Sequence, residues 1–170
     1  MIKREYLTSI LLLSFAAILQ STLFRYITIW NVKPDLVLII LVFVASRRGS
    51  MVGQVTGFWG GFVEDLLSTA PLGFNALIKT LIGYIYGIIE DRIVIDPIIL
   101  PVLIVGIATI IKYLFVAVIS AIFSIESIGA VLISSRFLVE ILYNSLSAPF
   151  VFALLSLIKS LKPREKTLSL

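Results

Sequence analysis

The sequence predicts an all-α, polytopic integral membrane protein, and three observations support this fold class. Hydrophobic residues make up 59% of the 170 residues, which exceeds the roughly 45–50% typical of soluble globular domains. Charged residues amount to only 14%, and long stretches contain none. Several of these stretches are long enough to cross a bilayer as helices, and they lack the alternating segments of about 10 residues that mark a transmembrane β-barrel.

Six hydrophobic segments predict a six-helix transmembrane bundle in a single domain. Their approximate ranges are 6–24, 34–46, 49–67, 72–89, 98–123 and 136–158. The second segment is short, because its apolar core extends only about 16 Å as a helix, whereas the hydrocarbon core of a bilayer is about 30 Å thick. We expect neighbouring helices or local bilayer thinning to accommodate it. The stretch 128–135, which precedes the last helix, is expected to lie along the outer interface.

The distribution of basic residues predicts that both termini are cytoplasmic. The basic N-terminus leads into an apolar stretch with no A-x-A-like cleavage site, so we expect a retained signal anchor. With the N-terminus inside, nine basic residues fall in predicted cytoplasmic segments and only Arg25 and Lys33 in outer ones, as the positive-inside rule requires. The nine are Lys3, Arg4, Arg47, Arg48, Arg92, Lys159, Lys162, Arg164 and Lys166. A re-entrant second segment would place the basic tail, 159–170, outside and break the rule. We expect this tail to contact anionic lipid headgroups in the cytoplasm.

The chain contains no cysteine and no histidine. This composition excludes disulfides, thiolate metal sites, haem and iron–sulfur ligation, and catalytic triads built on these residues. We therefore expect a protein that is not an enzyme and that uses no metal ion and no cofactor. The net charge of +4 comes from basic residues at loop ends and in the tail. That distribution is typical of membrane orientation rather than of nucleic-acid binding.

Glycines recur every four residues at Gly49, Gly53, Gly57 and Gly61, and the next position on the same helix face is Asp65. In a soluble helix each interior glycine would cost about 0.5–1 kcal/mol relative to alanine, but inside lipid a glycine face lets another backbone approach closely. Three interpretations are open: packing against helices of the same chain, homodimerisation, and docking of a partner helix. The pattern favours close contact without indicating whose helix makes it.

Polar residues at two helix ends each have a structural and a functional interpretation. Pro34 and Asp35 begin the second segment, where they serve as a helix start or as an outer-face anchor for a partner. Glu64 and Asp65 end the third segment, where the helix dipole disfavours carboxylates, so a cationic group is expected nearby. Lys79 in the next helix is a candidate to pair with Asp65 by snorkelling. The alternative is a ligand or partner site.

Polar residues inside the membrane form a candidate network of Lys79, Lys112, Arg136, Glu140 and Asn144. Lys112 falls near the middle of the fifth segment, where a lysine costs about 2.5–3.5 kcal/mol, so it needs a partner. Glu140 can pair with Arg136 one turn away or reach across to Lys112, and the cost of an unpaired lysine favours the second arrangement. The network is interpreted as structural glue, as a transport site, or as a polar patch that faces a partner.

Four short motifs follow one another in a distinctive order. They are KPDL at 33–36, RRG at 47–49, GQVTGFWGGFVED at 53–65 and APLGFNAL at 70–77. In this order and at these spacings they resemble the rod shape-determining protein MreD family. The resemblance covers the whole chain in length and segment order, and its specific part runs from Pro34 to Gly83. The last two helices are similar to the family only in hydropathy.

The resemblance implies a non-enzymatic scaffold of the bacterial inner membrane that belongs to the elongation machinery and helps to regulate cell shape and side-wall peptidoglycan synthesis. Its implied partner is MreC, a single-span protein with a periplasmic domain. MreB and the RodA–penicillin-binding-protein synthase are expected in the same assembly. The glycine face and Asp65 are then expected to support docking of the MreC helix, directly or through the fold.

The MreD family is also similar in fold to the S-components of energy-coupling-factor transporters, which are six-helix membrane proteins that bind vitamins. This similarity implies an S-component-like bundle and keeps a second function open, that of a small-molecule carrier. The charged residues inside the membrane favour such a carrier. The short outer loops, which hold few polar and aromatic residues, count against a ligand pocket beneath them.

Overall fold

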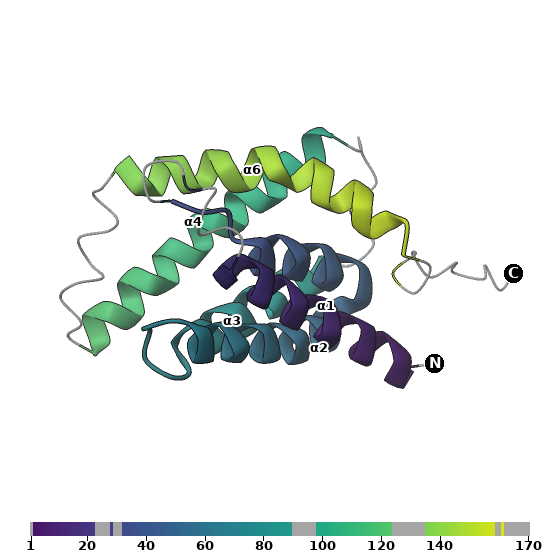
Figure 1. Ribbon diagram of the computed structural model, residues 1–170, viewed down its shortest axis with the longest axis horizontal. Helices are drawn as coiled ribbons and strands as arrows, with labels where there is room; N and C mark the ends of the chain where they lie inside the picture. Colours follow the sequence, from purple (N-terminus) through teal and green to yellow (C-terminus); the bar gives the residue numbers. More distant parts are fainter. Residues whose placement is uncertain are drawn as a thin grey trace, which may run out of the picture.

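The computed structural model describes residues 2–22, 28, 32–89, 98–123, 135–158 and 161. Five α-helices form these regions (Figure 1). They are α1 (Ile2–Thr22), α2 (Leu36–Leu67), α3 (Phe74–Ile88), α4 (Ile99–Ile122) and α6 (Ser135–Ser156). The basic loop residue Arg92, the stretch 128–134 and the tail apart from residue 161 lie outside the described part of the chain.

The second helix folds back on itself at Gly49. That residue has φ 83° and ψ 173°, a combination essentially restricted to glycine. We call the two halves α2a (36–48) and α2b (50–67). Side chains of α2a lie against glycines of α2b in reverse order along the chain: Ala45 against Gly53, Leu41 against Gly57 and Val37 against Gly60. The two halves are therefore antiparallel, and a single backbone conformation at Gly49 turns one apolar run into a helical hairpin.

The turn at Gly49 accounts for the difference between the six predicted helices and the five labelled elements among the described residues. The predicted second and third segments correspond to α2a and α2b, two helices that meet at this kink and are labelled together as α2. By length and composition, α4, residues 136–156 of α6 and α2, counted through its turn at Gly49, are candidate membrane spans, and α1 and α3 contain shorter apolar helices. The structure is thus all-helical and has the apolar helices of a membrane protein.

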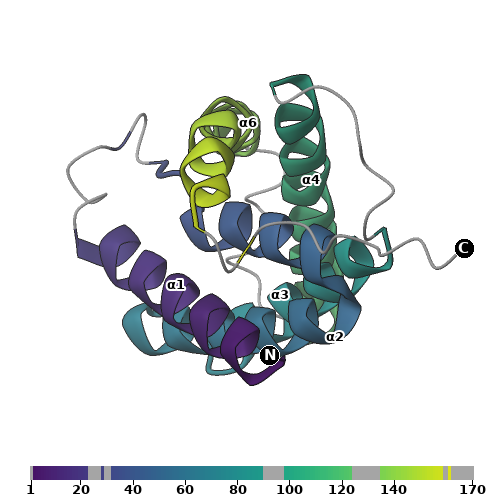
Figure 2. The ribbon, with the colours of Figure 1, turned by 90° about the vertical axis from the view of Figure 1, so that its right-hand side faces the viewer.

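The short half α2a is the centre of the bundle. Nine consecutive residues, 37–45, are buried, and most have no exposed surface at all. In Figure 2, α1 and α3 lie on one side of this segment and α4 and α6 on the other. Because neighbouring helices surround it, α2a does not need the length of a helix that faces lipid. Burial within the bundle therefore accommodates the short segment.

The described helices alternate in direction, which gives the bundle two ends (Figure 1). We call the first the Asp35 end. It holds the end of α1, the start of α2a, the turn between α2b and α3, the end of α4 and the start of α6. We call the other the Gly49 end. It holds the start of α1, the turn at Gly49, the end of α3, the start of α4 and the end of α6.

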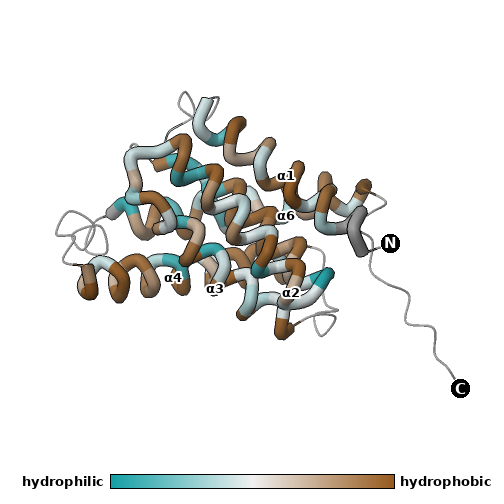
Figure 3. The backbone as a smooth tube through the Cα atoms, turned by 90° about the horizontal axis from the view of Figure 1, so that it is seen from below, coloured by the Kyte–Doolittle hydropathy of each residue, from teal (hydrophilic) through white to brown (hydrophobic). Residues whose placement is uncertain are grey.

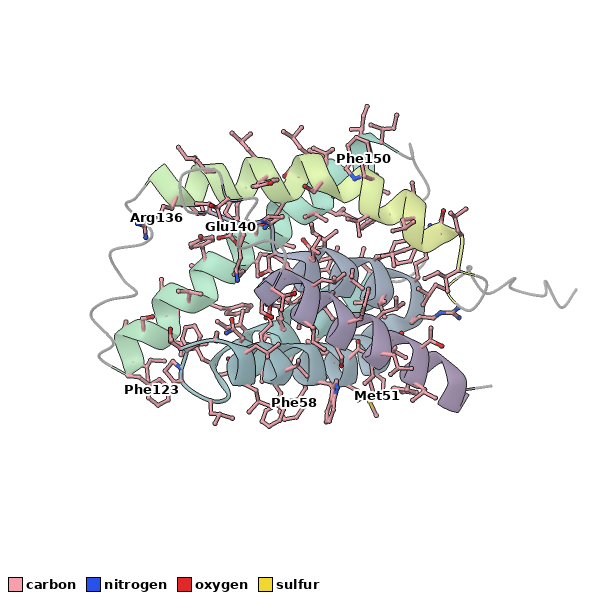
Figure 4. All side chains as sticks on the ribbon, viewed as in Figure 1. Met51, Phe58, Phe123, Arg136, Glu140 and Phe150 are labelled. Carbon is pink, nitrogen blue, oxygen red and sulfur yellow. The ribbon has the colours of Figure 1, made fainter. Side chains whose placement is uncertain are left out.

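The outer surface of the bundle is apolar. Hydrophobic residues predominate along every helix (Figure 3). The side chains of Met51, Phe58, Phe123 and Phe150 point away from the bundle (Figure 4), and each is more than half exposed. A surface of this kind is stable against hydrocarbon and costly against water, which agrees with a bundle that lies in a bilayer.

Candidate functional site: a buried ionic cluster

Asp35 is the centre of a buried cluster of charges. Its Oδ2 atom lies 2.7 Å from the Nζ atom of Lys112 and 3.3 Å from that of Lys79. Its Oδ1 atom accepts a hydrogen bond of 2.9 Å from the backbone N–H of Leu38 and so caps the start of α2a. One carboxylate therefore begins the central helix and joins it to α3 and α4. We call Asp35, Glu64, Lys79, Lys112 and Glu140 the ionic cluster.

Lys79 is buried on the α3 side of the cluster. It also forms an ion pair with Glu64 of α2b, and the side chains of Lys79 and Glu64 are 2% and 11% exposed. Gln20, in the last turn of α1, donates from Nε2 to Oε1 of Glu64 at 3.2 Å. The Oε1 atom of the same amide accepts from the N–H of Val37 at 3.4 Å. The last turn of α1 is thereby tied to both halves of α2.

The α4 side of the cluster is completed by α6. The Nζ atom of Lys112 lies 2.6 Å from Oε1 of Glu140, and Tyr113 donates its hydroxyl to the other carboxylate oxygen at 2.5 Å. Figure 4 shows Glu140 pointing from α6 toward α4. This side is less enclosed, since the Lys112 side chain is 17% exposed and that of Glu140 12%. The high cost of a midspan lysine predicted that Lys112 pairs with Glu140, and this pair is present. Lys112 also has a second partner, Asp35.

Asn144 connects the cluster to the backbone. Its Oδ1 atom accepts from the N–H of Asp35 at 2.7 Å, and its Nδ2 group donates to Oγ1 of Thr109 at 3.1 Å. Asn144 and Thr109 have no exposed surface. A buried amide must find partners for both of its ends, and here it does so between α2a and α4. Every described helix thus contributes a side chain to one continuous polar network.

Mutual pairing explains how this network is tolerated inside an apolar bundle. An isolated buried charge costs several kcal/mol of desolvation, and this cost is offset only when partners and hydrogen bonds of good geometry surround it. The cluster contains three carboxylates and two ammonium groups within contact of one another. Removing one member would leave its partners uncompensated. The arrangement therefore makes the relative position of the helices specific.

Asp65 lies outside the cluster and has a different role. Its Oδ2 atom accepts from the backbone N–H groups of Gly73 and Ala76 at 2.9 and 3.2 Å. Its Oδ1 atom accepts from the backbone and side chain of Asn75 at 3.0 and 2.9 Å. The predicted Asp65–Lys79 contact is replaced by the Glu64–Lys79 pair, because Asp65 turns toward the free N–H groups that begin α3. Its charge is unfavourable for its own helix end and favourable for the next helix start.

The glycine face packs within the chain. A Cβ atom at Gly53 would meet the backbone of Gly83, one at Gly57 the backbone of Lys79, and one at Gly61 the backbone of Asn75, all within 3.0 Å. Real Cβ atoms do not approach other atoms so closely. Glycine is therefore required for α2b and α3 to come together. Gly49 is required for another reason, the turn between α2a and α2b.

The remaining predicted site residues lie at the Asp35 end. Pro34 is buried beside Asp35, while Arg136 is exposed at the start of α6, apart from the cluster. Glu64, Gln20 and Tyr113 belong to the network although the sequence did not place them there. A carboxylate and an amide inside apolar helices are signals that could have identified the first two. The hydroxyl of Tyr113 gives no comparable signal, because tyrosine is also enriched in membrane proteins as an interfacial anchor.

The carboxylates of the ionic cluster are arranged for pairing with lysines. Within the described residues, no group of three or more carboxylates, cysteines or histidines is placed to hold a metal ion. The carboxylates of the cluster are instead directed at lysines, which occupy the positions that a cation would take.

Comparison with protein families shows the family of the chain. Residues 2–158 match the family of the rod shape-determining protein MreD. The chain belongs to the MreD family. The match includes all five helices and every residue of the ionic cluster. Neither the comparison with curated proteins nor that with solved structures gave a match. Membership of the MreD family implies a role in rod shape determination, and the apolar helices agree with a membrane protein.

Proposed function

We propose that this MreD-family chain is a non-enzymatic scaffold of the bacterial inner membrane. In this role it binds the single-span protein MreC and helps to regulate side-wall peptidoglycan synthesis, in one assembly with MreB and the RodA–penicillin-binding-protein synthase. The observation that carries the proposal is the internal pairing of the ionic cluster. Its lysines and carboxylates bond to one another and to neighbouring side chains, so they are engaged within the protein rather than directed at a substrate.

The glycine face supports MreC binding through the fold rather than by direct contact. Gly53, Gly57 and Gly61 are covered by α3, so a second helix does not reach them in this arrangement. The partner helix would instead meet the outer apolar surface that the close packing of α2b and α3 shapes. Loss of the glycine contacts would then weaken MreC binding by moving the helices that present this surface.

The test is purification of the tagged chain from its native membrane in mild detergent, with mass spectrometry of retained proteins and small molecules. Recovery of MreC and of wall-synthesis components is the expected result. Recovery of ATPase subunits, or of a bound metabolite in a fixed ratio to the protein, would contradict the scaffold and favour a small-molecule carrier.

Two variants connect this test to the structure. Gly57→Leu and Gly61→Leu are expected to abolish co-purification of MreC while the protein is still expressed. Their thermal unfolding should shift in parallel, because the effect acts through helix packing. If both variants still co-purify with MreC, the packing of α2b against α3 does not contribute to MreC binding.

A further inference from the structure

The described helices divide into two packing units. α1 and α3 each pack extensively against α2, whereas α4 and α6 pack chiefly against each other. Figure 2 shows α4 and α6 together on one side of α2a. We propose that α4 and α6 form a movable unit, which an ionic latch holds against α1–α3 at the Asp35 end and which pivots at the Gly49 end. The movement goes beyond the proposed scaffold role and does not depend on MreC.

Polar bonds form the latch at the Asp35 end. Lys112 of α4 binds the Asp35 carboxylate, and Asn144 of α6 binds the Asp35 backbone N–H. Both bonds cross from one unit to the other and converge on the residue that starts α2a. Lys79 and Glu64 bind the same region, but they belong to the α1–α3 unit. Lys79 and Lys112 thus carry the same charge, but Lys112 joins the two units through Asp35, whereas the ion pairs of Lys79 stay within the α1–α3 unit.

Apolar packing forms the pivot at the Gly49 end. The rings of Phe43 in α2a and Phe152 in α6 meet edge to face with centroids 4.9 Å apart. Leu155 and Leu161 are buried in the same core. Tyr86 of α3 donates a hydrogen bond of 2.7 Å to the backbone carbonyl of Ile104 in α4. These contacts bury apolar surface and need no charge, so they persist when the ionic pairs separate.

A proline in α6 allows the start of the helix to move while its end stays packed. Pro149 lies inside the helix, between Asn144 at the latch and Phe152 at the pivot. A proline within a helix removes one backbone hydrogen bond and favours a bend. The Lys112–Glu140 pair lies within the movable unit and keeps α4 and α6 joined when the bonds to Asp35 separate, while Lys79 stays with the other unit.

The natural absence of cysteine makes the movement measurable by spin-label distances in the full chain. One pair of labels, at Leu66→Cys and Leu138→Cys, spans the two units at the Asp35 end. A second pair, at Met51→Cys and Leu154→Cys, spans them at the Gly49 end. All four side chains are more than half exposed, so labels at these positions avoid the core.

Lys112→Met and Lys79→Met are the matched variants. Lys112→Met is expected to lengthen and broaden the distance at the Asp35 end and to leave the Gly49 end unchanged. Lys79→Met should change neither distance, because its bonds stay within one unit. An unchanged Asp35 end in Lys112→Met, or equal changes at both ends, would overturn the latch.

A second variant covers the case in which Lys112→Met does not fold. Asn144→Ala removes the other latch bond and leaves all five charges of the cluster in place. It is expected to broaden the Asp35-end distance distribution relative to that of the Gly49 end. Distributions as narrow as those of the unsubstituted chain at both ends would overturn the proposal.

Discussion

The Nζ atom of Lys112, in the middle of α4, lies 2.7 Å from the carboxylate of Asp35, which begins α2a. The two residues are 77 positions apart in the chain. Their contact brings the midspan lysine to the start of the central helix and places both within reach of α3 and α6. A charge that would be a defect in an isolated helix thus becomes a point at which the bundle is held together.

The first prediction concerns the coupling between Lys112 and Glu140. Lys112→Met removes the lysine that pairs with Glu140 and one of the two lysines that pair with Asp35, so we expect a loss of about 3–5 kcal/mol in the free energy of unfolding. The double variant Lys112→Met/Glu140→Gln should lose less free energy of unfolding than the sum of the two single variants. In the double variant the neutral amide of residue 140 needs no cationic partner. Denaturant unfolding in detergent measures all three variants.

Arg136→Met is the control for this cycle. Arg136 lies one turn before Glu140 on α6 but is exposed, so its removal should change the free energy of unfolding by no more than about 0.5 kcal/mol. Additive effects of Lys112→Met and Glu140→Gln would show that the two residues do not act as a pair.

The ionic cluster shows how far the sequence leads toward this site. The cost of a midspan lysine identified Lys112, and the four-residue spacing of α6 identified Glu140 and Asn144. Asp35 was assigned to a helix start, which it is, but its contacts with Lys79 and Lys112 depend on how Gly49 folds α2 back. Such contacts join residues far apart in the chain, and local periodicity contains no information about them.

The choice between Glu64 and Asp65 illustrates a second limit. Adjacent residues on a helix point about 100° apart, so the carboxylate that meets Lys79 depends on the rotation of α2b relative to α3. That rotation is set by the glycine contacts with Gly83, Lys79 and Asn75. The glycine spacing predicted a close helix approach, but the partner helix and its register follow only from the assembled bundle.

The second prediction concerns the role of Asp65 at the start of α3. Asp65→Asn replaces one acceptor oxygen with an NH₂ group that faces backbone N–H donors. Since hydrogen bonds to a charged group contribute about 1.5–3 kcal/mol, we expect a destabilisation of that order and a lower melting temperature. Circular dichroism on heating measures it. Ser68→Ala, in the exposed turn that follows α2b, is the control and should melt close to the parent protein.

The third prediction separates close packing from backbone conformation among the glycines. Gly57→Ala places a methyl group against the backbone of Lys79, so we expect a loss of about 1–3 kcal/mol from overpacking. Gly73 has φ 92° and open space around its missing side chain. Gly73→Asn should therefore be tolerated, because asparagine adopts positive φ more readily than most residues. Equal destabilisation by the two changes would contradict the helix-contact role of Gly57.

The last prediction tests whether α2a is the apolar centre of the bundle. Phe152 of α6 packs its ring edge-on against Phe43 of α2a, whereas Phe150, two residues earlier, is 78% exposed. Phe152→Ala should lower the free energy of unfolding by about 1–3 kcal/mol, which is less than the cost of deleting a fully buried ring because Phe152 is partly buried. Phe150→Ala deletes the same ring from the surface of the same helix and should have a much smaller effect in detergent. If the two variants unfold alike, the contact between α6 and the central helix does not contribute to stability, and the Gly49 end does not hold the two packing units together.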